Sequence, residues 1–293
     1  MNQYICRYCR QPSDPSQPTC PLCGAPVDIK SVVSDSGWVE QPAIRDMARI
    51  QFGQSHVQIS GTRVPTAEFT LAPQDWIYFS HHMLLWSEPQ TRLDSMRMKG
   101  GWSRKLAGMP LIMMQAAGPG HLALSDNHPG EVVALPLHHG QGMWVREHRF
   151  LAATGNVTYD WDMNHVWFTT GSGDDKEWHH PMGQYGDIFT AGGGPGLLLL
   201  HSPGNTFIRD LRHGESLLIQ PSSLLYRDQS VRMHLHLEYP RNLGFSFWSN
   251  LDYRSIWVRL YGPGRVAVQS VYAPAEECEP ITDYSYGTTR HRW

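Results

Sequence analysis

The tripeptide Gly-Pro-Gly occurs three times in this chain of 293 residues, at 118–120, 194–196 and 262–264. The segments after the first two copies align at a spacing of 74 residues (204 − 130). Five aligned features share this spacing: Pro129-Gly130 with Pro203-Gly204, Leu137 with Leu211, His139-Gly140 with His213-Gly214, Leu151 with Leu225, and Val157 with Val231. A weaker, earlier copy places Leu71 and Leu85 66 residues (137 − 71) before Leu137 and Leu151. Such a pattern indicates an internal repeat, which restricts the chain to one supersecondary unit used several times.

We expect three pseudo-repeated β-units, near residues 53–115, 118–190 and 194–260. The third Gly-Pro-Gly opens a closing segment, 262–275, that the chain never extends into a full unit. We expect this segment to supply the opening strand that the first unit lacks. A polar tail follows over 276–293.

Alternation and composition both favour strands over helices. Apolar residues recur at every second position, and turn dipeptides follow about every ten residues, as in a sandwich or coiled sheet. Charged residues make up 17% of the chain, against about 25% in an average protein, whereas Gly (27), Pro (21), Trp (11) and Tyr (12) are frequent. We therefore expect an all-β fold, a β-sandwich or coiled double sheet. The net charge of −3 argues against a general phosphate-binding surface as the main function.

Four of the five cysteines lie near the start of the chain. Cys6 and Cys9 form one C-x-x-C pair, and Cys20 and Cys23 form a second. Each two-residue gap folds the backbone into a tight turn that directs both sulfurs to one ion, so two such turns complete a tetrahedron. Gly24 suits the left-handed backbone that often ends such a turn. The spacing predicts a small zinc ribbon with a structural zinc ion.

Other interpretations of the cysteines remain open. Two disulfides would need an oxidising compartment, and no export signal supports one. A redox pair would normally begin a helix in a larger fold. Iron takes the same four ligands, so metal binding is better supported than the identity of the metal. The fifth cysteine, Cys278, stands alone and is expected to be an ordinary thiol.

The expected organisation is a zinc-ribbon-like module at 1–30, a linker at 31–40 and a β domain at 41–275. A short helix is expected over 42–50, with Pro42 in its first turn. No stretch of about 18 apolar residues suggests a membrane-spanning helix. With no recognisable leader at the N-terminus, a cytoplasmic protein is expected.

A second metal site is predicted in the sequence MHLHLEY. On a strand, His234, His236 and Glu238 project from one face, and two imidazoles with a carboxylate are a common ligand set of metal enzymes. The competing interpretation is an ordinary polar strand face. His139 and His213 each precede a glycine, which favours a structural role in turns.

A basic and aromatic stretch lies at 96–106. It is a candidate contact for nucleic acid or an anionic membrane surface, although such residues are also ordinary for a solvated turn. Its charged and aromatic residues are Arg97, Lys99, Trp102, Arg104 and Lys105.

From about Gln51 to Ala273 the chain resembles the AIM24 family. The segments that carry the resemblance are KGGW and RKLAGMP, AAGPGHLALS, PGEVVALPL, FLAATGNV and AGGGPGLLLLHSPG. The resemblance implies a β-rich fold similar to the tryptophan-attenuator-protein (TRAP) type, with three pseudo-repeated sheets. Mitochondrial members are associated with inner-membrane organisation, which implies a scaffold and not a catalyst. This chain differs in its thiolate pairs and shows no transit peptide, so the mitochondrial location is not carried over.

The sequence thus predicts a non-enzymatic scaffold or interaction protein with a structural zinc site. A protein partner or self-association is expected, because repeated sheets offer faces and edges for assembly. The family supplies no agreed catalytic residues. The alternatives are a metal-dependent enzyme at the His/His/Glu strand and a nucleic-acid-binding module that uses the ribbon.

Overall fold

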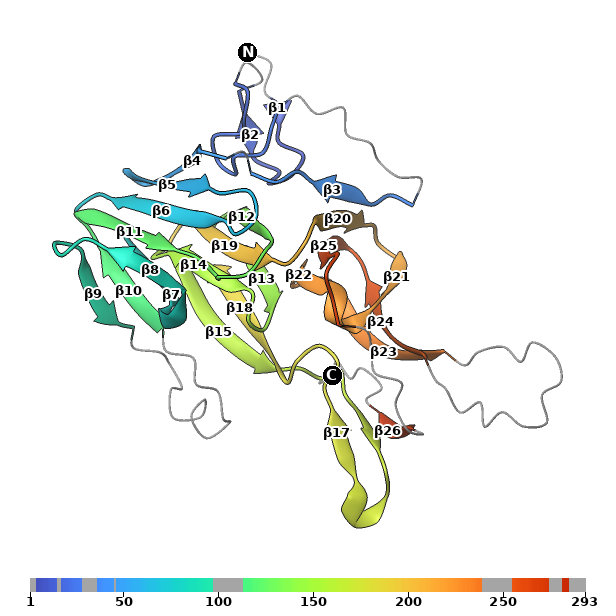
Figure 1. Cartoon of the computed structure of the whole chain (residues 1–293). Coiled ribbons are helices and arrows are strands. Elements are labelled where there is room, and N and C mark those ends of the chain that lie inside the picture. Colours follow the sequence, from blue (N-terminus) through green and yellow to red (C-terminus); the bar gives the residue numbers. More distant parts are fainter. Residues whose placement is uncertain are drawn as a thin grey trace.

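A computed structural model of the chain describes residues 4–14, 17–27, 36–44, 46–96, 113–238, 255–273 and 281–284. Within them the secondary structure is antiparallel strands and three single turns of 3-10 helix: η1 (His81–Met83), η2 (Gly173–Asp175) and η3 (Pro221–Ser223). The all-β fold expected from the sequence is confirmed (Figure 1). In the same residues no helix is long and apolar enough to cross a membrane.

Three large sheets form the body. The first has the order β4 (Ala48–Phe52), β5 (Ser55–Ser60), β6 (Thr66–Leu71), β11 (Gly120–Leu124), β8 (Leu84–Ser87). The second has the order β12 (Glu131–Leu137), β19 (Gly196–Ser202), β14 (Phe150–Thr154), β7 (Trp76–Ser80), β10 (Met113–Ala117), β9 (Arg92–Ser95). The third has the order β15 (Val157–Met163), β18 (Tyr185–Ala191), β13 (Gly142–Arg146), β22 (Leu224–Asp228), β25 (Gly264–Gln269), β20 (Thr206–Leu211), β3 (Val39–Gln41).

Three smaller sheets complete the described structure. One contains β21 (Ser216–Ile219), β24 (Ser255–Tyr261) and β23 (Arg232–Glu238). Another contains β17 (Glu177–His179), β16 (Phe168–Thr170) and β26 (Ile281–Tyr284), and it projects below the body in Figure 1. The last pairs β1 (Tyr4–Ile5) with β2 (Pro12–Ser13), above the body in the same view.

Each Gly-Pro-Gly tripeptide leads directly into a strand that pairs with strands preceding it in the chain. β11 lies between β6 and β8, β19 between β12 and β14, and β25 between β20 and β22. The expectation that the C-terminal strand completes the first unit is therefore wrong, because β25 pairs with β20 and β22, which belong to the third expected unit. The spacing of similar segments in the sequence does not by itself say which strands pair in space.

The expected short helix over 42–50 is also wrong. Residues 48–52 form β4, which pairs with β5 from Ala48 opposite Ile59 to Phe52 opposite Ser55. Ile50 is completely buried while its neighbours Arg49 and Gln51 are exposed. This alternation is that of a strand with one buried face, and tertiary pairing overrides the local helix signal.

The two histidine–glycine dipeptides form turns, as the sequence predicted. Residues 139–140 and 213–214 lie in turns, and both Gly140 and Gly214 have a φ of +81°. A left-handed backbone of this kind favours glycine, because a side chain would meet the following carbonyl.

Buried apolar side chains form two clusters. The larger one joins the ribbon to the three large sheets, since Cys6, Cys20 and Cys23 belong to the same cluster as Ile50 of β4, Phe79 of β7 and Tyr226 of β22. The smaller one lies around β24 and the strands next to it, with Val258 and Leu260 completely buried. The ribbon therefore shares its apolar core with the body.

Candidate metal centre

Two similar backbone turns position the four cysteines. In the first, the Arg10 amide donates to the Cys6 carbonyl at 2.8 Å, and Arg10 has a φ of +63°. In the second, the Gly24 amide donates to the Cys20 carbonyl at 2.8 Å, and Gly24 has a φ of +69°. The left-handed conformation expected at Gly24 is confirmed. The same conformation at Arg10 was missed, because a non-glycine residue gives no such signal in the sequence.

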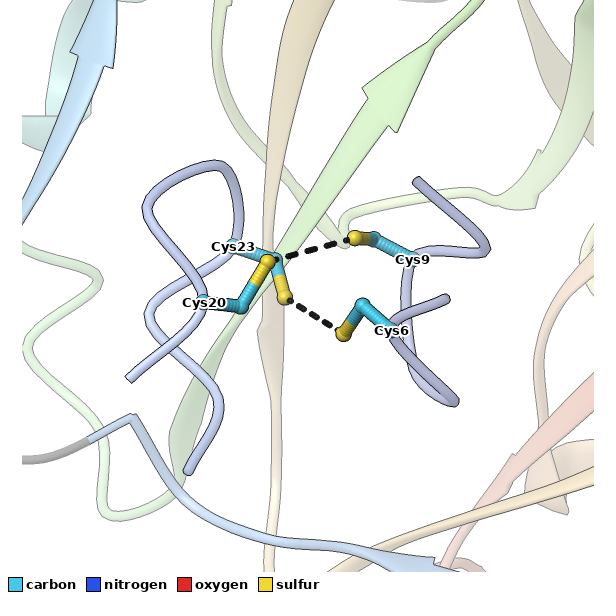
Figure 2. A group of neighbouring side chains, drawn as sticks. All are labelled: Cys6, Cys9, Cys20 and Cys23. Carbon is cyan, nitrogen blue, oxygen red and sulfur yellow. Dashed lines mark hydrogen bonds between the residues drawn. The ribbon is translucent and has the colours of Figure 1, made fainter. Parts of the chain in front are cut away.

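The four sulfurs converge on one point (Figure 2). All four Sγ atoms lie within 4.8 Å of one another, and the Cys6–Cys23 and Cys9–Cys20 pairs are both separated by 3.7 Å. A tetrahedral ion with bonds of about 2.3 Å to sulfur would separate its ligands by about 3.8 Å, so the site fits zinc. A disulfide would need about 2.05 Å, and these cysteines are free.

Mutual contact shifts the pKa values of these thiols in opposite directions. Cys6, Cys20 and Cys23 are buried and Cys9 is half-buried. Hydrogen bonds from Cys23, and then from Cys6 and Cys9, hold the pKa of Cys20 far below its ordinary value. The pKa of Cys23 is raised instead, chiefly by its contact with Cys20. A divalent cation would let all four ionise, because a coordinating thiol is deprotonated.

Arg265 holds the ribbon against the body. Its buried guanidinium donates to the backbone carbonyls of Tyr8 and, at 3.2 Å, of Arg7, both inside the first cysteine turn. It also binds both carboxylate oxygens of Asp210, at 3.0 and 2.9 Å. Burial would raise the pKa of Asp210, but the hydrogen bonds and charge of Arg265 outweigh it and keep this pKa below its ordinary value. One side chain thus joins the first cysteine turn to β20 and β25.

Further contacts fix the same interface. Arg10 donates to Asp210 at 2.7 Å and to Asp228 at 3.2 Å, so this arginine is engaged with carboxylates of the body. A side chain at Gly24 would come within 2.9 Å of Ile44, which shows how closely the second turn approaches the body. One sequence signal of this contact exists: Arg265 begins the otherwise apolar stretch RVAV of β25.

The second predicted metal site stays a prediction. His234 and His236 lie at alternate positions of β23, opposite Arg259 and Trp257 of β24. The His234 ring lies 5.3 Å from the Tyr261 ring, edge to face. The side chain of Glu238 lies outside the described residues. In the part of the chain that the structure describes, the four cysteines form the one group of three or more ligands close enough for a metal.

Two other sequence features lie outside the described residues. They are Cys278 and the basic and aromatic stretch at 96–106 beyond Met96. Neither prediction is therefore tested.

Fold and site together define an all-β protein with a four-cysteine ribbon packed on its body. The family described as Mitochondrial biogenesis AIM24 matches residues 57–271, and the chain belongs to this family. The resemblance seen in the sequence is confirmed. The cysteine ribbon precedes the matched residues, so it lies outside the family's common region.

A solved structure shares the fold. The crystal structure of protein SPYM3_0169 from Streptococcus pyogenes matches with a TM-score of 0.55 and 19% sequence identity, over 74% of this chain and 94% of that one. No curated protein matches the chain. At this identity the comparison shows a common fold and nothing about activity.

Proposed function

We propose that this protein is a non-enzymatic scaffold of the AIM24 type, in which a zinc ion in the ribbon has a structural role. The observation that carries the proposal is the convergence of four sulfurs on one point. Four sulfur ligands fill a tetrahedral ion and leave no open position for water or substrate, as in structural zinc sites. The hydrogen bonds from Arg265 to the first cysteine turn also support it, because they hold the ribbon against the body.

A protein partner or self-association is part of this proposal, because a scaffold acts through contacts. A cytoplasmic location is also proposed, since thiolates persist as metal ligands in a reducing compartment. The competing function is a metal-dependent enzyme that uses His234, His236 and Glu238.

Metal content separates these two functions. Elemental mass spectrometry of the full-length protein should find one zinc per chain. The double variant His234→Ala and His236→Ala should keep this zinc, whereas Cys9→Ser should lose most of it. Cys278→Ser serves as the matched thiol control and should behave like the wild type. Loss of metal in the histidine variant with retention in Cys9→Ser would favour the enzyme.

A further inference from the structure

Among the edge strands of the described residues, β8 and β21 occupy corresponding ends of their sheets. β8 is the terminal strand of the first sheet and pairs with β11 alone, while β21 is the terminal strand of its sheet and pairs with β24 alone. In Figure 1, β8 lies in the left part of the body and β21 at the right. Such edges present free backbone donors and acceptors to another strand.

Two junctions inside the chain show how edges of this kind pair. β14 pairs with β7, placing Ala152 opposite Phe79. β22 pairs with β13, placing Tyr226 opposite Val145. By the sequence alignment, Tyr226 corresponds to Ala152 (226 − 152 = 74) and Val145 to Phe79 (145 − 79 = 66). The two junctions therefore join corresponding strands in the same antiparallel register.

β8 and β21 are the third pair of corresponding strands. At the same spacings, Trp86 of β8 corresponds to Ala152 (152 − 86 = 66), and Ile219 of β21 corresponds to Val145 (219 − 145 = 74). A third junction in the same register would place Trp86 opposite Ile219 and Ser87 opposite Leu218.

Exposure of apolar side chains on β8 agrees with a missing partner. Leu85 is 59% exposed, whereas the corresponding Leu151 and Leu225 are 1% and 0% exposed. Trp86 is 41% exposed, whereas Tyr226 at the corresponding position is completely buried. Large apolar side chains on an open edge mark an interaction surface.

We propose that β8 of one copy pairs with β21 of a second copy, antiparallel, with Trp86 opposite Ile219. The inference rests on the proposed scaffold function and gives it a specific mode of self-association. Because two different edges meet, the contact is head-to-tail and produces a ring if the rotation closes, or a filament if it does not.

Substitution at the exposed edge tests the contact without disturbing the core. Sedimentation velocity over a range of concentrations should show the wild type in multi-chain assemblies. Trp86→Arg should raise the apparent Kd at least about tenfold, as loss of a central aromatic contact does. Trp178→Arg is the matched control, because Trp178 is 57% exposed on β17, outside both edges, and should assemble like the wild type. A wild type that stays monomeric at every concentration, or equal assembly of both variants, would overturn the proposal.

Cross-linking tests the register. In a Cys278→Ser background, a mixture of Ser87→Cys and Leu218→Cys chains should form a covalent dimer on mild oxidation, and neither variant should do so alone. A link within a single chain carrying both substitutions, or a link between two identical variants, would contradict pairing of β8 with β21 of a second copy. Zinc content separates the two proposals, since Trp86→Arg should retain one zinc per chain whatever its assembly.

Discussion

Replacing Cys20 with serine is expected to remove the zinc and unfold the ribbon. Cys20 is buried, with its sulfur 3.7 Å from that of Cys9 and 3.1 Å from the Ser13 hydroxyl. Structural zinc contributes about 10–16 kcal/mol of apparent binding energy in small metal-stabilised domains, and the ribbon is too short to keep a core without it. Hydrogen exchange should therefore show lost protection of the backbone at residues 6–11 and 20–25.

The body should also be destabilised, because the ribbon cysteines share a core with Ile50 and Val57. Thermal unfolding should begin at a lower temperature in Cys20→Ser than in the wild type. Cys278→Ser provides the control and should retain both zinc and exchange protection. Full zinc occupancy in Cys20→Ser would refute a four-sulfur site.

Replacing Arg265 with alanine is expected to release the ribbon from the body while the zinc stays bound. The substitution removes donors to two carbonyls in the first cysteine turn and to both carboxylate oxygens of Asp210. Hydrogen bonds from a charged group contribute about 1.5–3 kcal/mol each, and part of this is recovered by water. We therefore expect a loss of about 2–4 kcal/mol in the free energy that holds the ribbon against the body.

Limited proteolysis and zinc content together measure this effect. Arg265→Ala should be cut sooner between the ribbon and β3, with one zinc still bound. The rate at which Arg265→Lys is cut should fall between those of Arg265→Ala and the wild type, because an ammonium group cannot reproduce the planar arrangement of donors in a guanidinium. Arg92→Ala is the control, since Arg92 forms an exposed ion pair with Asp94 at 3.5 Å, a contact of small energetic value. Unchanged proteolysis of Arg265→Ala would contradict its role in attachment.

Local chemistry made the cysteine cluster predictable from sequence. Two C-x-x-C pairs require tight turns, and the structure brings all four sulfurs together as that spacing predicts. Gly24 was identified for the same reason, since its left-handed backbone follows from the turn. The all-β fold was equally predictable, because alternating apolar residues and frequent turn residues can be recognised in the sequence without knowledge of distant contacts.

Features that depend on distant contacts were not predictable. The attachment of the ribbon through Arg265 joins residues more than 250 positions apart, and no spacing rule connects them. The strand at 48–52 was missed because its pairing with β5 and the burial of Ile50 override a local helix signal. The partners of β25 were assigned wrongly for a similar reason, since a repeat fixes correspondence between segments but not strand order.

The measurement that tests the central claim most directly is X-ray absorption at the zinc edge of the full-length protein. Four sulfur neighbours at about 2.3 Å, with no lighter ligand, is the result expected for a closed structural site made by Cys6, Cys9, Cys20 and Cys23. Nitrogen or oxygen neighbours at about 2.0–2.2 Å would instead show that zinc binds elsewhere or has an open position. That result would contradict the structural role of the ribbon and favour the histidine strand β23 as the metal site.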